Sequence, residues 1–171
     1  MDQKPISNLM AGLVLAAILI IYSLVLYFAG LELNTALSLA TYVLLIAGLI
    51  IYIRLYGKSK AGQVVFGQLF GYGFRTTLVI TSLFIVFLIV LNLIFPEMKQ
   101  KVLDMARQRL EAMGRYSEDQ IDQAIEINRK GYLVFQLLGT IFGFMIAGAL
   151  ASLIGAAITK KTPVSPFQAN Q

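Results

Sequence analysis

Long stretches almost free of charged side chains alternate along the chain with short polar connections. A bilayer core about 30 Å thick is crossed by roughly 20 apolar residues of α-helix, because the helix rises about 1.5 Å per residue. Runs of about this length recur along the sequence. They predict four transmembrane helices, at about residues 9–31, 33–55, 76–95 and 132–159.

The third apolar stretch, from Ala61 to Phe95, contains a single charged residue, Arg75. A charge at the centre of a transmembrane helix costs about 2.5–3.5 kcal/mol on insertion scales, so we expect Arg75 at the membrane interface. The glycine-rich residues before it, 63–74, then form an interfacial lead-in segment with helical character. The third span itself begins after Arg75.

The first apolar stretch follows a short N-terminal segment containing Lys4, an arrangement shared with cleaved signal peptides. Its apolar run is longer than the usual hydrophobic region of a signal peptide, and no small-x-small cleavage site is found where one would fall, from Leu24 to Phe28. We interpret this stretch as an uncleaved membrane anchor.

The polar segment from Pro96 to Gly131 is patterned as a helical hairpin. Pro96 suits a first helical position, Glu97 suits the positive end of a helix dipole, and Gly114 suits a helix end. Between them, apolar residues recur at steps of three and four and form one stripe: Met98, Val102, Met105, Ala106, Leu110 and Met113. This stripe could pack within the hairpin, on the membrane surface or on another protein.

The second helix of the hairpin has a specific start signal. Ser117 and Gln120 have the spacing of a capping box, and Tyr116 with Ile121 has that of a hydrophobic staple. Gly131 is a candidate joint with the fourth span. The predicted fold is therefore an all-α integral membrane protein, a single membrane domain over residues 1–171, with four transmembrane helices and an amphipathic helical hairpin (96–131) between helices three and four.

Composition agrees with a membrane protein and narrows its chemistry. Hydrophobic residues make up 58% of the chain and charged residues 13%, whereas soluble domains have about 45–50% and about 25%. The chain has no His and no Cys, which removes the commonest proton shuttles, thiol nucleophiles and soft-metal ligands. It also lacks the P-loop, the Gly-x-Ser-x-Gly elbow and His-Glu-x-x-His. We expect no catalytic residue, metal site or cofactor, and no enzyme.

Basic residues are distributed unevenly between the two sides of the predicted topology. Four spans place both termini and the middle loop together, and this side carries one acidic residue, Asp2, against seven basic residues: Lys4, Arg54, Lys58, Lys60, Arg75, Lys160 and Lys161. The positive-inside rule then predicts a multi-pass membrane protein with both termini cytoplasmic. The rule counts Lys and Arg rather than net charge, however, and the hairpin has equally many. The net charge of +5 does not indicate nucleic acid, because these residues lie at loop ends without interleaved aromatics.

Two kinds of candidate site remain. Arg75 is a candidate contact with lipid phosphate at headgroup level, or simply an interfacial anchor that ends the span. In the fourth span, small residues at four-residue steps let another helix approach closely, and they form a candidate helix-packing site: Gly139, Gly143, Ala147, Ala151 and Gly155. We expect them to pack within the chain, with Gly12 and Ala16 as the complement, rather than on another protein.

Polar side chains inside the spans are few. We expect them to form hydrogen bonds between helices rather than to bind a substrate: Thr41, Asn92, Gln136 and Thr140.

The order of short motifs resembles a known family. The motifs are Gly57-Lys58-Ser59-Lys60, the segment from Phe66 to Phe74, Phe95-Pro96-Glu97, the Ser117 to Asp122 hairpin turn and a small-residue span ending in Lys160-Lys161. Over nearly the whole chain this arrangement resembles the bacterial membrane family called domain of unknown function 4199. The resemblance implies a small four-span inner-membrane protein with a polar hairpin between spans three and four, and it supplies no activity and no functional residues.

The function expected from these features is a structural or regulatory partner of other envelope proteins. Its distinctive surfaces are a small-residue helix face and an amphipathic hairpin, and neither is a site for chemistry. The expected partners are the lipid bilayer and either another membrane protein or a second copy of the chain. The alternative is a transporter or channel for a neutral or lipidic solute, with Asn92, Gln136 and Thr140 lining its path.

Overall fold

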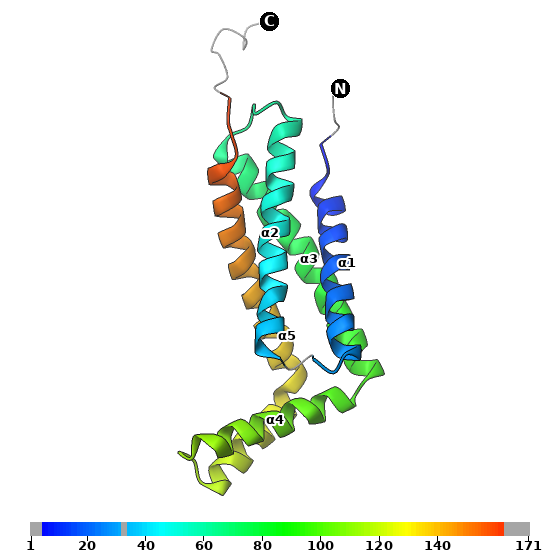
Figure 1. The fold of residues 1–171 in the computed structure, drawn as a ribbon, viewed down its shortest axis with the longest axis vertical. Coiled ribbons are helices and arrows are strands. Elements are labelled where there is room, and N and C mark those ends of the chain that lie inside the picture. The colour runs from blue at the N-terminus through cyan, green and yellow to red at the C-terminus, as the bar shows by residue number, and fades with distance from the viewer. Residues whose placement is uncertain (1–4, 32–33, 163–171) are drawn as a thin grey trace, which may run out of the picture. The chain divides into compact units, whose positions relative to one another are not determined.

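The computed structural model describes residues 5–31 and 34–162, which form five α-helices and no strand (Figure 1). In chain order the helices are α1 (Asn8–Phe28), α2 (Thr35–Ser59), α3 (Phe66–Ile94), α4 (Glu97–Met113) and α5 (Glu118–Ile158). Four of them, α1, α2, α3 and α5, are long and apolar enough to cross a membrane. The all-helical fold and the number of candidate spans are as the sequence predicts.

Two helices are longer than the sequence predicts. α3 is continuous through Arg75, so residues 66–74 belong to the same helix as the predicted span and do not form a separate segment. Its first turn is capped, because the side-chain Oε1 of Gln68 accepts a hydrogen bond of 3.2 Å from the backbone N–H of Val65. α5 is likewise continuous through Gly131, where a joint was expected. The open side of that glycine is covered by the ring of Phe135, one helical turn further on.

The chain divides into two compact units. Unit 1 comprises Met1–Phe84 and Gly143–Gln171, and unit 2 comprises Ile85–Phe142. α3 and α5 run through both units, so unit 1 contains α1, α2, most of α3 and the C-terminal part of α5.

Glycines mark the closest approaches of helices in unit 1. A Cβ added to Gly12 of α1 would lie 2.6 Å from Cγ1 of Val79 on α3, and one added to Gly155 of α5 would lie 2.8 Å from Cδ1 of Ile53 on α2. These contacts let backbones approach closely, so that van der Waals packing holds the helices together. The largest fully buried apolar side chains of unit 1 come from α1, α2 and α3: Leu19, Leu45, Leu49, Ile53, Leu69 and Ile80.

The outer faces of the unit 1 helices are also apolar. Among the most exposed side chains are Ile21, Val25 and Phe28 on α1 and Val43 and Ile51 on α2. A helix that is apolar on all sides is typical of a membrane span or of the core of a large protein.

Unit 2 contains the end of α3, all of α4 and the first part of α5. Leu103 of α4 is buried with Ile121 and Ile125 of α5, and Ala106 and Leu110 pack against this cluster. Within unit 2, the apolar face of α4 is therefore covered by α5. The predicted stripe is partly wrong: it omitted Leu103, which is 2% exposed, and it included Met113, which is 57% exposed.

The turn between α4 and α5 has the predicted caps. Gly114 ends α4 with φ 61°, a left-handed conformation that glycine adopts without strain. The Ser117 backbone N–H donates to Oε1 of Gln120 (3.0 Å), and the Gln120 backbone N–H donates to Oγ of Ser117 (3.4 Å). This reciprocal pair is the capping box that the sequence predicts.

Of the predicted polar residues in unit 2, Asn92 and Gln136 bond between helices, as the sequence predicts, whereas Thr140 bonds within its own helix. Nδ2 of Asn92 on α3 donates to Oε1 of Gln136 on α5 (2.8 Å) and to the carbonyl oxygen of Leu88 (2.8 Å). The Thr140 hydroxyl donates to the carbonyl oxygen of Gln136 (2.9 Å). The two helices are thus joined by a side-chain hydrogen bond.

Candidate functional site

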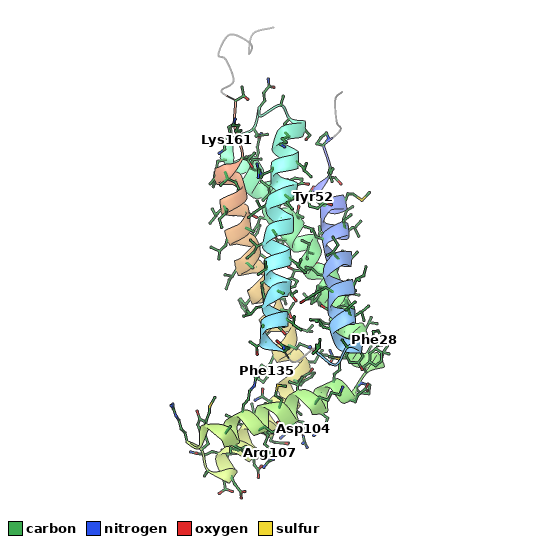
Figure 2. All side chains as sticks on the ribbon, in the orientation of Figure 1. Phe28, Tyr52, Asp104, Arg107, Phe135 and Lys161 are labelled. Carbon is green, nitrogen blue, oxygen red and sulfur yellow. The ribbon has the colours of Figure 1, made fainter. Side chains whose placement is uncertain are left out.

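One end of unit 1 is basic. The residues come from the end of α2, the first part of α3 and the end of α5: Arg54, Lys58, Lys60, Arg75, Lys160 and Lys161. Figure 2 shows Lys161 at this end. The described part of unit 1 contains no Asp or Glu, so these cations have no carboxylate partner within it. The summed field of such a cluster attracts anions.

The turn between α2 and α3 holds this end together. Ala61 and Gly62 adopt positive φ angles of 50° and 76°. The backbone N–H of Thr162, just after α5, donates to the Gly62 carbonyl oxygen (2.9 Å), and a Cβ added to Gly62 would lie 2.5 Å from the Thr162 hydroxyl. Glycine is therefore required at position 62 for both its conformation and its contact. The turn fixes Lys60 beside the chain that carries Lys160 and Lys161.

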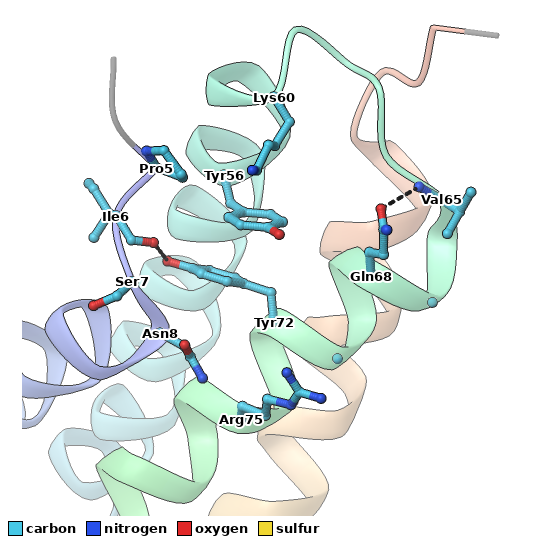
Figure 3. Close-up of a pocket in the computed structure, with 12 residues that line it drawn as sticks. Pro5, Ile6, Ser7, Asn8, Tyr56, Lys60, Val65, Gln68, Tyr72 and Arg75 are labelled. Atoms are coloured by element: carbon cyan, nitrogen blue, oxygen red, sulfur yellow. Dashed lines mark hydrogen bonds between the residues drawn. The ribbon is translucent and has the colours of Figure 1, made fainter. Parts of the chain in front are cut away.

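A cavity of about 630 Å³ opens at this end, between the segment before α1, the end of α2 and the first part of α3 (Figure 3). The polar side chains that line it are Ser7, Asn8, Lys60, Gln68 and Arg75. We refer to it as the Arg75 cavity.

Stacked tyrosines form part of its wall. The rings of Tyr56 and Tyr72 lie 4.3 Å apart at an angle of 15°. The Tyr72 hydroxyl donates a hydrogen bond of 3.0 Å to the carbonyl oxygen of Ile6, which ties the N-terminal segment to α3. Gly67 and Gly71 also line the cavity, and a Cβ added to either would meet no atom within 4 Å. Glycine here keeps the wall open.

A second cavity, of about 450 Å³, is lined by three of the other cations, Arg54, Lys58 and Lys160. Its hydroxyls are already engaged: Thr159 donates to the Gly155 carbonyl oxygen (2.6 Å) and Thr162 to that of Ala61 (3.3 Å). Lys161 lines neither cavity, and its Nζ lies 5.6 Å from the centroid of the Phe66 ring, a cation–π geometry.

The structure therefore places Arg75 in a cavity with Lys60, Gln68 and Asn8, a grouping that the sequence analysis did not find. One local signal was available. Gly67, Gly71 and Arg75 follow one another at four-residue steps and so share one face of α3. The contributions of α2 and of the N-terminal segment carry no such signal.

The predicted helix-packing residues are placed unevenly. A Cβ added to Gly143 would lie 2.5 Å from the hydroxyl of Tyr42 on α2, and Ala147, Ala151 and Gly155 are buried in unit 1. Gly139, in unit 2, has no atom within 4 Å of an added Cβ. Four of the five residues therefore pack against other side chains of unit 1.

The packing partner expected for Gly12 of α1 is wrong. Gly12 lies against Val79 and the backbone of Thr76 on α3 rather than against α5. α5 instead meets α3 through two flanking residues: Gly148 contacts Thr77, and a Cβ added to Gly73 would lie 2.5 Å from the Ser152 hydroxyl.

Chemically, the basic end offers donors rather than metal ligands. Within residues 5–31 and 34–162, no group of three or more His, Cys, Asp or Glu side chains could hold a metal ion. The guanidinium of Arg75, the ammonium of Lys60 and the side-chain amides of Gln68 and Asn8 all supply N–H groups. An anion with several oxygens is the complementary ligand.

Comparison with known proteins gives one match. No curated protein and no solved structure matches the chain. A family model described as "Protein of unknown function (DUF4199)" matches residues 11–161, in agreement with the resemblance seen in the sequence motifs. The match includes all of α2, α3, α4 and α5 and most of α1, so the chain belongs to the DUF4199 family.

Proposed function

We propose that the protein spans the bacterial inner membrane with α1, α2, α3 and α5 and acts there as a structural or regulatory partner of other envelope proteins. The length and apolar character of these helices support the membrane placement. Their exposed apolar side chains would face lipid. The absence of His and Cys from the chain supports a role other than catalysis.

The observation that carries the orientation is the separation of charge between the units. Every acidic residue that the structure describes lies in unit 2, between Glu97 and Glu126, whereas the described charges of unit 1 are all positive. Basic residues are retained on the cytoplasmic side of membrane proteins. Unit 2 carries Lys and Arg as well, but there they are accompanied by acidic residues. We therefore propose that the basic end of unit 1, and with it both termini, faces the cytoplasm.

The partner role is supported by the surface of α4 and the first part of α5. This region carries charges of both signs, and Figure 2 shows Asp104 and Arg107 on α4. It also exposes Met113, Tyr116 and Ile127, three large apolar side chains, beside these charges. Exposed aromatic and Met side chains among polar residues are typical of protein interfaces.

The transporter alternative has less support. It requires polar side chains that face a solute path, and Asn92 and Gln136 instead donate and accept a hydrogen bond with each other. Thr140 bonds to the backbone of its own helix.

Orientation is tested by cysteine labelling, because the chain has no native Cys. In intact cells, Ser117→Cys should react with a membrane-impermeant thiol reagent, and Lys161→Cys should react only after permeabilisation. Both positions are exposed, so burial would not mask either one. The reverse pattern would overturn the proposed orientation.

The partner role is tested by replacing Met113 and Ile127, one at a time, with a photocrosslinking amino acid and crosslinking in native membranes. The same foreign protein should be captured from both positions and identified by mass spectrometry. Ile51, exposed on the apolar face of α2, is the matched position from which only lipid adducts are expected. Crosslinks to lipid or to the chain itself from all three positions would contradict the partner role.

A further inference from the structure

We propose that the Arg75 cavity binds a phosphate group, carried by an anionic phospholipid headgroup or by a soluble phosphate ester. The binding site consists of Arg75 and Lys60 as charged ligands, Gln68 and Asn8 as neutral donors, and an aromatic wall. This proposal goes beyond the proposed function, because phosphate binding requires only the basic end of unit 1 and no protein partner.

The first argument is charge. Arg75 and Lys60 line one cavity, and no Asp or Glu of the described part of unit 1 neutralises them. Two cations that line one cavity without a counter-ion make its potential positive, and this potential attracts an anion. A phosphate group is matched to Arg75, because a guanidinium can donate two parallel hydrogen bonds to it, and the Lys60 ammonium adds positive charge across the tyrosine wall.

The second argument is shape. The volume of about 630 Å³ lies within the range of small-ligand pockets, about 300–1,000 Å³. In Figure 3 the stacked rings of Tyr56 and Tyr72 lie between the Lys60 side chain and the Arg75 side chain. Such a wall offers apolar surface to the carbon atoms of a glycerol or similar group, while its cationic edges meet the phosphate.

The third argument is the neutral donors. Oε1 of Gln68 accepts the hydrogen bond from Val65, so the amide NH₂ of Gln68 is the end left to meet a ligand. Asn8 enters the cavity from the first turn of α1, on the same side of Tyr72 as Arg75 (Figure 3). The second cavity has more cations, but its Thr159 and Thr162 hydroxyls already donate to backbone carbonyls. The Arg75 cavity is therefore the better-built anion site.

The experiment uses the full chain purified in a neutral detergent, so it depends on neither orientation nor partner. Native mass spectrometry measures retention of phosphatidylglycerol against phosphatidylcholine, and thermal shift measures binding of inorganic phosphate and glycerol 3-phosphate. Arg75→Gln should weaken binding at least about tenfold, or about 1.4 kcal/mol, a change expected when a hydrogen bond to a charged group is lost.

A second variant tests the cavity without changing charge. Gly71→Leu places a side chain into the open space of the cavity, where the added Cβ meets no atom within 4 Å, so the fold should be retained. It should also weaken binding at least about tenfold. Thermal unfolding of each variant without ligand establishes that the fold is intact.

The matched controls are Lys161→Gln and Lys58→Gln, which make the same change of charge outside the Arg75 cavity. Both should bind like the unmodified chain. If Arg75→Gln and Lys161→Gln weakened ligand binding equally, the attraction would be a diffuse surface effect and the proposal would be overturned. It would also be overturned if Lys58→Gln were the only variant to weaken binding. If Arg75→Gln weakens the binding of phosphatidylglycerol alone, the ligand is a lipid. If it weakens the binding of inorganic phosphate or glycerol 3-phosphate, the ligand is soluble.

Discussion

The hydroxyl of Tyr72 donates a hydrogen bond of 3.0 Å to the carbonyl oxygen of Ile6, although the two residues are 66 positions apart in the sequence. This bond fixes the segment before α1 against α3, just ahead of Ser7, whose hydroxyl accepts a hydrogen bond from the Met10 N–H and caps α1. The bond therefore positions one wall of the Arg75 cavity and the start of the first helix together.

Removal of that hydroxyl should loosen the N-terminal segment. Tyr72→Phe keeps the ring stacked on Tyr56 and loses one hydrogen bond, so the free energy of unfolding should fall by about 0.5–1.5 kcal/mol. Hydrogen–deuterium exchange of the peptide around Ser7 should become faster. Tyr56→Phe is the matched control, because its ring is the other half of the stack. Equal exchange in the two variants would contradict the role of the Tyr72 hydroxyl.

The Asn92–Gln136 bond should couple α3 to α5. In a double-mutant cycle with Asn92→Leu and Gln136→Leu, we expect a coupling energy of about 0.6 kcal/mol and at most about 1.7 kcal/mol, the range of hydrogen bonds between membrane helices. Unfolding in mixed micelles measures it. Thr140→Val, which removes a bond within one helix, should show no coupling to Asn92→Leu. If Thr140→Val coupled to Asn92→Leu as strongly as Gln136→Leu does, the coupling would not be specific to the Asn92–Gln136 bond.

Glycines of α5 should tolerate larger side chains only where space exists. Gly143→Leu forces a side chain against Tyr42 and should destabilise the protein by about 1–3 kcal/mol, the usual cost of overpacking. Gly139→Leu makes the same change one turn earlier, in open space, and should be neutral or stabilising because leucine favours a helix more than glycine does. Thermal unfolding of both variants checks this, and equal destabilisation would contradict the assigned packing.

Thr81 is a buried polar residue whose hydroxyl has no hydrogen-bond partner among the residues that the structure describes. Such a group costs about 1–3 kcal/mol, so Thr81→Val, which is similar in size, should raise the free energy of unfolding by about this amount. Thr76 and Thr77 are also buried on α3, but their hydroxyls donate to carbonyl oxygens one turn earlier. Thr77→Val should therefore give no such gain, and a larger gain there than at position 81 would refute the argument.

The features predicted correctly from the sequence are local ones. An apolar run long enough to cross a bilayer, or a Ser117–Gln120 capping box, is determined by residues within a few turns of one another. The continuity of α3 and α5 was missed for the opposite reason. Arg75 and Gly131 look like interruptions in sequence, but each is accommodated within its own helix, where no break is needed.

The candidate site shows the same division. Arg75 was identified because a charge within a long apolar run is unusual. Its grouping with Lys60 and Asn8 was not, since the cavity brings together three segments that are separated along the chain. The partner of Gly12 was predicted on the wrong helix, because small residues permit close packing but do not specify which helix approaches.

The attachment of α4 to α5 should depend on apolar burial more than on charge. Arg107 bridges Asp122 of α5 (2.5 Å) and Glu111 of its own helix (3.0 Å), and these hydrogen bonds raise the pKa of the guanidinium further, so Arg107 stays charged. All three side chains are well exposed, however, and exposed ion pairs contribute little. Leu103→Ala should destabilise unit 2 by about 2–5 kcal/mol, because it leaves a cavity beside Ile121 and Ile125. Arg107→Ala is the control. If hydrogen exchange of α4 were faster in Arg107→Ala than in Leu103→Ala, the ion pairs would dominate the attachment.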